Sequence, residues 1–331
     1  MPHRPTHPTR RQVLTTLAAA AALPTMAPAQ AQAAFPSKPI TLLVPFAPGG
    51  IADITARTVA QAMGPLLGQT VVVDNRPSAG SIVASQAVAK AAPDGYTLLL
   101  MSNGHAVSAN LFKKLPYDVA KDFAPITTLG FFEMVVAVDA GSRFKSLGEL
   151  LAYAKANPGK LNIGTIAVGS TQHLAAELLK MRAGMDALIV PFKGSPDVLR
   201  ALKAGDIDVA VEILGPTMSQ ITGGSVRALA LTDDRRNPVL PDVPTVQESG
   251  VKDYDVTSWN ALAAPAGTPA DVVAKIGKAA RDALATPAVH KRLQELGVRA
   301  QAGTPAQLET LLATDTRRWR DVIQAAKIEL Q

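Results

Sequence analysis

The chain alternates between two hydrophobic periods from residue 35 onward. Short apolar runs typical of buried strands are each followed by a segment with apolar residues at helical spacing. The first such pair is the run 40–44 and the segment 51–66, in which the apolar residues are Ile51, Ile54, Val59, Met63 and Leu66. Strand–helix–strand units of this length predict a mostly parallel sheet with helices on both faces.

Further strands and helices follow in the same alternation. Strands are predicted at 70–74, 97–101, 161–164, 187–192, 206–211, 226–231 and 256–263. Helices are predicted at 81–90, 146–156, 172–182 and 195–203, from about 216, and at 269–284, 287–296 and 305–327. The last third of the chain is therefore mainly helical.

The apolar, β-branched segment 125–138 is longer than an edge strand needs. We interpret it as a strand that crosses between two lobes. The first lobe would comprise residues 34–135 and 237–331, and the second lobe residues 136–236. The pattern thus predicts an α/β fold with two lobes, each a mixed, mostly parallel sheet flanked by helices.

Two turns that join a strand to a helix offer backbone groups to a ligand. Pro48-Gly49-Gly50 follows the first strand, and Gly169-Ser170-Thr171 repeats the arrangement in the second lobe. The unpaired N–H groups and the positive end of the helix dipole at such a turn can hold a small anion. A glycine pair alone is better explained as a helix cap, but the repetition favours a carboxylate held between two helix ends.

The loop Ser102-Asn103-Gly104-His105 follows another predicted strand and leads towards a short helix. Ligands of α/β sheets bind at the carboxyl ends of strands. Ser102, Asn103 and His105 are therefore candidates to line the cleft.

Residues 1–33 have the composition of an export signal. A basic start with Arg10-Arg11 precedes the apolar run 17–23, and small residues accumulate up to Ala31-Gln32-Ala33. The paired arginines resemble a twin-arginine signal, although a basic start also serves the general pathway. We expect cleavage near Ala33/Ala34 and a periplasmic mature protein, because the apolar run is too short to span a bilayer well.

Composition excludes several classes of site. The formal charge is +6, of which Arg4, Arg10 and Arg11 supply half, and aromatic residues make up only 4% of the chain, so no nucleic-acid partner is expected. The absence of cysteine excludes disulfides, zinc–thiolate sites, iron–sulfur clusters and a cysteine nucleophile. The five histidines lack ligand spacing, and no phosphate-binding or dinucleotide fingerprint occurs, so neither a metal nor a cofactor is expected.

Ser170 and His173 suggest a serine hydrolase only weakly. No Gly-x-Ser-x-Gly elbow is present. A role as helix N-cap explains Ser170 better. We do not expect an enzyme, although a hydrolase that uses this pair stays open as an alternative.

A series of motifs in fixed order carries a family resemblance. They are Pro45-Phe46-Ala47-Pro48-Gly49-Gly50-Ile51-Ala52-Asp53, Val73-Asp74-Asn75-Arg76-Pro77-Ser78-Ala79-Gly80, Pro93-Asp94-Gly95-Tyr96, Gly169-Ser170-Thr171-Gln172-His173-Leu174, Phe192-Lys193-Gly194 and Leu240-Pro241-Asp242-Val243-Pro244-Thr245. From Phe35 almost to its end, the chain resembles the Bug (TctC-like) periplasmic solute-binding receptors of tripartite tricarboxylate transport systems.

The resemblance implies a two-lobed periplasmic binding protein fold of type II that closes on a small carboxylate without catalysis. It implies that backbone groups and waters at the two junctions hold the carboxylate, and that the partners are membrane transporter subunits. A sensor that reports to a signalling partner is the alternative, and a monomer is expected.

The chain departs from the family pattern at three places. Trp259-Asn260-Ala261 lacks the glycine that commonly follows the tryptophan by two residues, Phe192 stands where tyrosine is common, and Asp315 replaces the glutamate that usually precedes Trp319. The first two departures bear on the pocket, so the resemblance does not identify the ligand. The third is expected to be structural.

Three further side chains are weighed as ligand-binding residues. Asp53 is expected either to bind an amino group or order waters, or only to satisfy the helix dipole. Lys193 is expected either to neutralise a second carboxylate or to be a surface or packing residue, and His173 lies beside the second junction. Trp259 and Trp319 are expected to pack in the core.

Overall fold

One long strand, β4 (Phe123–Asp139), belongs to both halves of the sheet. Its first part pairs antiparallel with β9 (Thr257–Pro265), ending at the pair Glu133 and Thr257. Its second part pairs antiparallel with β7 (Val209–Ile213), starting at the pair Met134 and Ile213. The crossing strand predicted from the apolar segment 125–138 is therefore present, and it makes the sheet continuous.

The structure is a computed structural model that describes His3 and residues 35–331. The predicted export signal and its cleavage site lie outside the described residues. Residues Pro36–Gln331 form one compact unit, and the description below concerns this unit. The lobe boundaries predicted from the sequence stay a prediction.

The first half of the sheet has the order β2-β1-β3-β9-β4. Strand β1 (Ile40–Val44) runs parallel to both neighbours, β2 (Val71–Asn75) and β3 (Thr97–Ser102), whereas β3 and β9 are antiparallel. A two-residue strand, β10 (Arg299–Ala300), pairs with β4. The sequence did not predict β10, because two residues carry no hydrophobic period.

The second half continues from β4 through β7 and β5 (Leu161–Ile166) to β6 (Ala187–Phe192). Strand β5 is parallel to both β6 and β7, and β8 (Val226–Leu231) is antiparallel to β4. The strand predicted at 206–211 starts later, at Val209. Asp208 precedes it, and its carboxylate accepts a hydrogen bond of 2.9 Å from the backbone N–H of Asn162.

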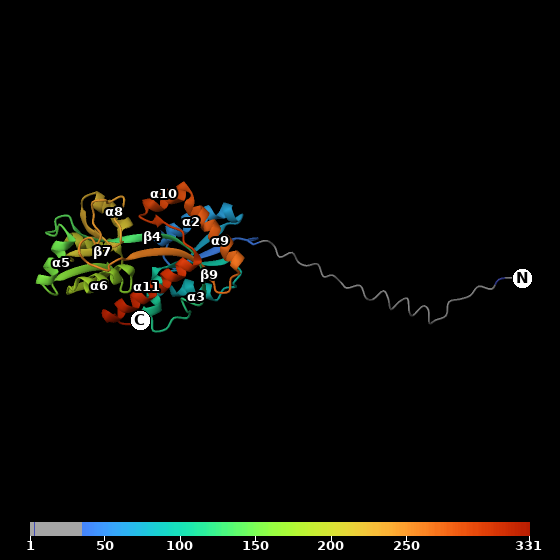
Figure 1. Cartoon of the computed structure of the whole chain (residues 1–331), viewed down its shortest axis with the longest axis horizontal. Helices are drawn as coiled ribbons and strands as arrows, with labels where there is room; N and C mark the ends of the chain where they lie inside the picture. Colours follow the sequence, from blue (N-terminus) through green and yellow to red (C-terminus); the bar gives the residue numbers. More distant parts are fainter. Residues whose placement is uncertain (1–2, 4–34) are drawn as a thin grey trace. The chain divides into compact units, whose positions relative to one another are not determined.

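Helices flank the two halves of the sheet. Around the half with β9 are α2 (Ile51–Leu67), the short 3-10 helix Ala79–Ser81, α3 (Ile82–Ala89), α4 (Asn103–Leu111), α9 (Ala270–Ala285) and α10 (Pro287–Glu295). Around the half with β7 are α5 (Leu147–Ala156), α6 (Thr171–Ala183), α7 (Ser195–Ala204) and α8 (Leu214–Thr222), and Figure 1 shows α5, α6 and α8 near β7. None of the helices within residues 35–331 has the length and hydrophobicity needed to cross a membrane.

The last helix, α11 (Pro305–Ala325), contacts both α4 and α6 and so touches elements of both halves. Two tryptophans anchor this region, and both are fully buried as predicted. Trp259 Nε1 donates to the Asp315 carboxylate at 2.7 Å, and Trp319 Nε1 donates to Asn103 Oδ1 at 2.8 Å. Each indole N–H thus has the partner that a buried tryptophan needs, and Asp315 has the structural role expected of it.

Candidate ligand-binding site

A cavity of about 540 Å³ lies where the starts of three helices meet. Its lining includes Gly50 at the start of α2, Ser102 and Gly104 at α4, and Gly169-Ser170-Thr171-Gln172 at α6. The loop after β2, residues 78–81, and the strand β9 complete it. The volume falls in the range of roughly 300–1,000 Å³ that is typical of sites for small organic molecules.

The start of α2 has the geometry of an anion site. Strand β1 ends at Val44, and Gly49 turns the chain with a φ of 86°, an angle that favours glycine. Gly50 is the N-cap, and no side-chain oxygen accepts from the first N–H groups of the helix. Gly50, Ile51 and Ala52 line the cavity, so these donors and the positive end of the helix dipole lie beside it.

Asp53 stabilises this turn through hydrogen bonds to its carboxylate. Its carboxylate accepts from Gly49 N at 2.8 Å, Arg57 Nε at 3.0 Å and Asn75 Nδ2 at 2.8 Å. Burial would raise the pKa of Asp53, but these hydrogen bonds and the Arg57 charge hold the pKa below its usual value. The side chain is buried and is not part of the cavity lining, which favours the structural interpretation of Asp53.

At the second start, the expected loop 102–105 is the N-cap and first turn of α4. Ser102 Oγ accepts from Gly104 N at 3.2 Å, and His105 Nδ1 accepts from Ser102 N at 3.0 Å. The hydrogen on His105 is then on Nε2, which lies 3.0 Å from Ser85 Oγ. Burial lowers the pKa of His105 to about 4, so this fully buried ring is neutral and holds the helix start.

Asn103 joins two helix starts. Its Nδ2 donates to Thr171 Oγ1 at the start of α6 at 2.9 Å, and its Oδ1 accepts from Trp319. Both the donor and the acceptor of this buried amide are therefore used. The turns that the sequence singled out in separate parts of the chain are brought together here.

The start of α6 depends on a glycine and a serine. Gly169 has a φ of 80°, and a Cβ at this position would collide with Leu111 of α4. Ser170 Oγ accepts from His173 N at 3.1 Å and donates to Ile166 O at 3.4 Å. The hydroxyl thus serves as the N-cap of α6.

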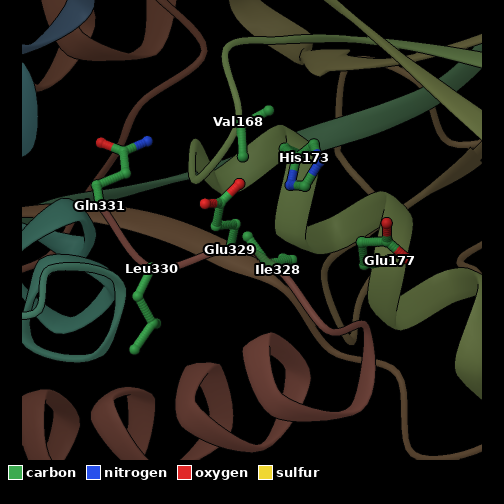
Figure 2. Close-up of a pocket in the computed structure, with 7 residues that line it drawn as sticks. All are labelled: Val168, His173, Glu177, Ile328, Glu329, Leu330 and Gln331. Carbon is green, nitrogen blue, oxygen red and sulfur yellow. The ribbon is translucent and has the colours of Figure 1, made fainter.

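The imidazole of His173 lies in a second cavity, of about 570 Å³, with Glu177 and the segment 328–331. Figure 2 shows this segment facing Val168 and the first turns of α6. Burial lowers the pKa of His173, and its Nδ1 has no hydrogen-bond partner. Among residues 35–331 no hydrogen bond joins this ring to the Ser170 hydroxyl, so the arrangement favours a helix cap over a nucleophile–base pair.

The other predicted site residues lie apart from the cavity lining. Pro48 and Gly49 are exposed beside it, and Lys193 is exposed just after β6. Within the described part of the chain no group of three or more His, Asp or Glu side chains is placed to hold a metal ion.

Sequence reasoning did not place several lining residues in the site. Asn260 and Ser258 of β9 and Phe132 of β4 line the cavity, together with the loop 78–81. Asn260 pairs with Ser102 across the sheet, although the two are far apart in sequence. The only signal at β9 was the departure from the family pattern at Trp259-Asn260-Ala261.

The positive potential of the cavity comes from backbone groups and not from side chains. None of its lining residues carries a charged side chain. Positive potential comes from the helix ends, each of which acts as roughly half a charge. The site can therefore hold an anion through backbone groups without a lysine or arginine.

Comparisons with known proteins find relatives over most of the chain. The family model described as the tripartite tricarboxylate transporter family receptor matches residues 55–328. Protein BugT of Bordetella pertussis is 34% identical over 299 residues, which cover 90% of this chain and 92% of BugT.

Two solved structures from Rhodopseudomonas palustris are also similar. MatC with bound malate is 34% identical with a TM-score of 0.75, covering 87% of this chain and 100% of that one. A second protein, with adipate, is 32% identical with a TM-score of 0.78, covering 89% and 99%. The family resemblance and the binding-protein fold predicted from the sequence are confirmed.

Proposed function

The chain belongs to the tripartite tricarboxylate transporter receptor family, and we propose that it captures a small organic carboxylate between two lobes and delivers it to a membrane transporter. The observation that carries this proposal is the convergence of three helix starts on one cavity without charged lining residues. The structures of relatives with malate and adipate support a carboxylate as the ligand class.

We place the ligand carboxylate at the start of α2. Here the N-cap Gly50 leaves the first N–H groups without a side-chain acceptor, whereas Ser102 and Ser170 cap α4 and α6. A carboxylate at this position would accept hydrogen bonds from backbone groups and interact favourably with the helix dipole. The two helices capped by serine would then shape the cavity around the rest of the ligand.

We further propose that the two lobes, residues 34–135 with 237–331 and residues 136–236, close on the ligand. Strand β4 crosses from one to the other, and Asn103 to Thr171 is a contact between them near the cavity. Export to the periplasm through the leader is part of the same proposal.

The melting temperature of the purified protein tests carboxylate binding. A ligand that binds only the native state must stabilise it, by about 2.7 kcal/mol at a concentration of 100 times Kd. A panel of mono-, di- and tricarboxylates is expected to contain at least one that raises the melting temperature. No rise with any of them would contradict the proposal.

Two other functions make different predictions. A hydrolase that uses Ser170 and His173 would consume the ligand, which product analysis of the incubated mixture detects. A sensor would bind the ligand equally well but would support no uptake when combined with the transporter subunits. Ligand recovered unchanged, together with receptor-dependent uptake, is the result expected here.

A further inference from the structure

A buried amide without partners lines the candidate cavity on the strand β9. Asn260 is 1% exposed, and neither its Nδ2 nor its Oδ1 has a hydrogen-bond partner among the residues that the structure describes. Leaving a buried polar group unpaired is costly, so such groups in native structures call for an explanation. An amide that offers both a donor and an acceptor into a ligand cavity is explained by a ligand group that accepts and donates.

Gln172, in the first turn of α6, is a different case. It also lines the cavity, and its Nε2 has no hydrogen-bond partner. Burial raises the pKa of Glu212, and the Ser195 hydroxyl and the Gln172 amide lower it. The Gln172 amide thus has a protein carboxyl nearby that can serve as its acceptor.

The position of Asn260 separates it from the proposed carboxylate position. The strand order is β1-β3-β9, Asn260 pairs with Ser102 at the end of β3, and α2 starts just after β1. Because neighbouring strands lie about 4.8 Å apart, two strand spacings of roughly 10 Å in all separate Asn260 from β1, the strand that leads into α2.

The remaining lining between these two polar ends is mostly apolar. Its larger apolar side chains include Phe46, Val107, Leu111, Phe112, Phe132 and Ile213. An apolar ligand body would bury its surface against them. A second carboxylate placed among these side chains would instead lose its hydration against apolar surface.

We propose that the ligand is a monocarboxylate with an apolar body and a distal hydroxyl or carboxamide group, and that Asn260 binds this distal group. This inference rests on the proposed function, because it takes the carboxylate to lie at α2. A distal carboxylate is disfavoured, because it cannot donate to Asn260 Oδ1. Asn260 is therefore the specificity-determining residue of the cavity.

Calorimetric titration with three probes of matched shape tests the proposal: phenylpropanoate, its para-hydroxy derivative and its para-carboxy derivative. The para-hydroxy acid is expected to bind at least about tenfold more tightly than phenylpropanoate, since a satisfied buried amide is worth about that factor. The para-carboxy acid is expected to bind most weakly.

The variant Asn260→Leu is expected to bind phenylpropanoate and to lose the preference for the hydroxyl. Asn157→Leu, which changes an amide outside the cavity, is the matched control and should keep the preference. If Asn260→Leu does not fold, the order of the three probes on the unaltered protein still decides.

Tightest binding of the para-carboxy acid, or a hydroxyl preference that survives in Asn260→Leu, would overturn the inference while leaving the proposed function intact. Absence of binding by these probes and by aliphatic mono-, di- and tricarboxylates would overturn both. The two failures are therefore distinguishable.

Discussion

Asn103 and Thr171 are joined by a hydrogen bond of 2.9 Å between the starts of two helices that belong to different halves of the sheet. Trp319 holds the other end of the Asn103 amide, so the side chain has little freedom to turn away. The contact fixes how α4 and α6 meet beside the cavity. It connects the packing of α11 directly with the geometry of the candidate site.

The variant Thr171→Val removes this hydrogen bond with little change of shape. The buried Asn103 Nδ2 loses its acceptor, and we expect the free energy of unfolding to fall by about 1–3 kcal/mol. Thr171→Ser keeps a hydroxyl, so its free energy of unfolding should fall by less. Urea denaturation measures both, and an unchanged free energy of unfolding in Thr171→Val would show that the hydrogen bond contributes nothing.

The glycine at 169 is expected to tolerate no side chain. Gly169→Ala meets both an unfavourable φ, which costs about 1–3 kcal/mol, and a collision with Leu111. Gly184→Ala is the control, because Gly184 also has a positive φ but nothing within 4 Å of a Cβ. Thermal unfolding should show the larger loss for Gly169→Ala.

A double variant separates the two causes at Gly169. Leu111→Ala removes the colliding atoms, so the loss in the variant that combines it with Gly169→Ala should be smaller than the sum of the single losses. Strict additivity would show that the Leu111 contact contributes nothing.

Glu133, at the point where β4 changes partners, makes stability depend on pH. The residue is 7% exposed, and burial raises its pKa from 4.5 to about 7, while the Asn237 amide lowers it, nearby Asp233 raises it and Arg299 lowers it. Between about pH 4.5 and 7 the folded state keeps a proton that the unfolded state has lost. This contribution to stability therefore decreases as pH rises, by about 3 kcal/mol in all.

The variant Glu133→Gln should remove this slope. The stability of this variant relative to the unaltered protein should increase as the pH rises from 5 to about 8. The contribution of His105 has the opposite sign and cancels in this comparison, because both proteins contain it. Glu309→Gln, at an exposed position, is the control and should show no such trend. A difference for Glu133→Gln that stays constant with pH would contradict a raised pKa.

Apolar periodicity was sufficient to predict most strands and helices, because burial on one face leaves a local pattern. It predicted β4 from the segment 125–138 and α11 from Pro305 onward. It failed at β10, which is too short for a period, and at Leu66, which lies in the apolar pattern of α2 but is 49% exposed.

Site residues could be predicted from the sequence only where they belong to turns and helix caps. Gly50 and the turn Gly169-Ser170-Thr171 were predicted, and they line the cavity. Turn residues and helix caps depend on short stretches of sequence, so the sequence alone can identify them. Asn260 was connected with the pocket only through a departure from the family pattern, because its position depends on which strand lies beside β3. His105 is a buried part of a helix start, a role that only its partners Ser102 and Ser85 reveal.

The central claim is that the start of α2 holds the ligand carboxylate through its backbone, and calorimetric titration of Gly50→Asp with a carboxylate ligand tests it most directly. An aspartate at the N-cap would accept from the same N–H groups and fill the position with its own charge, without loss of stability.

Gly194→Asp makes the same change at the uncapped N-cap of α7, outside the cavity lining. We predict that Gly50→Asp binds the ligand at least about 100-fold more weakly, as expected for the loss of several charge-assisted hydrogen bonds, and that Gly194→Asp binds it as the unaltered protein does. Unchanged binding by a folded Gly50→Asp variant would contradict the claim.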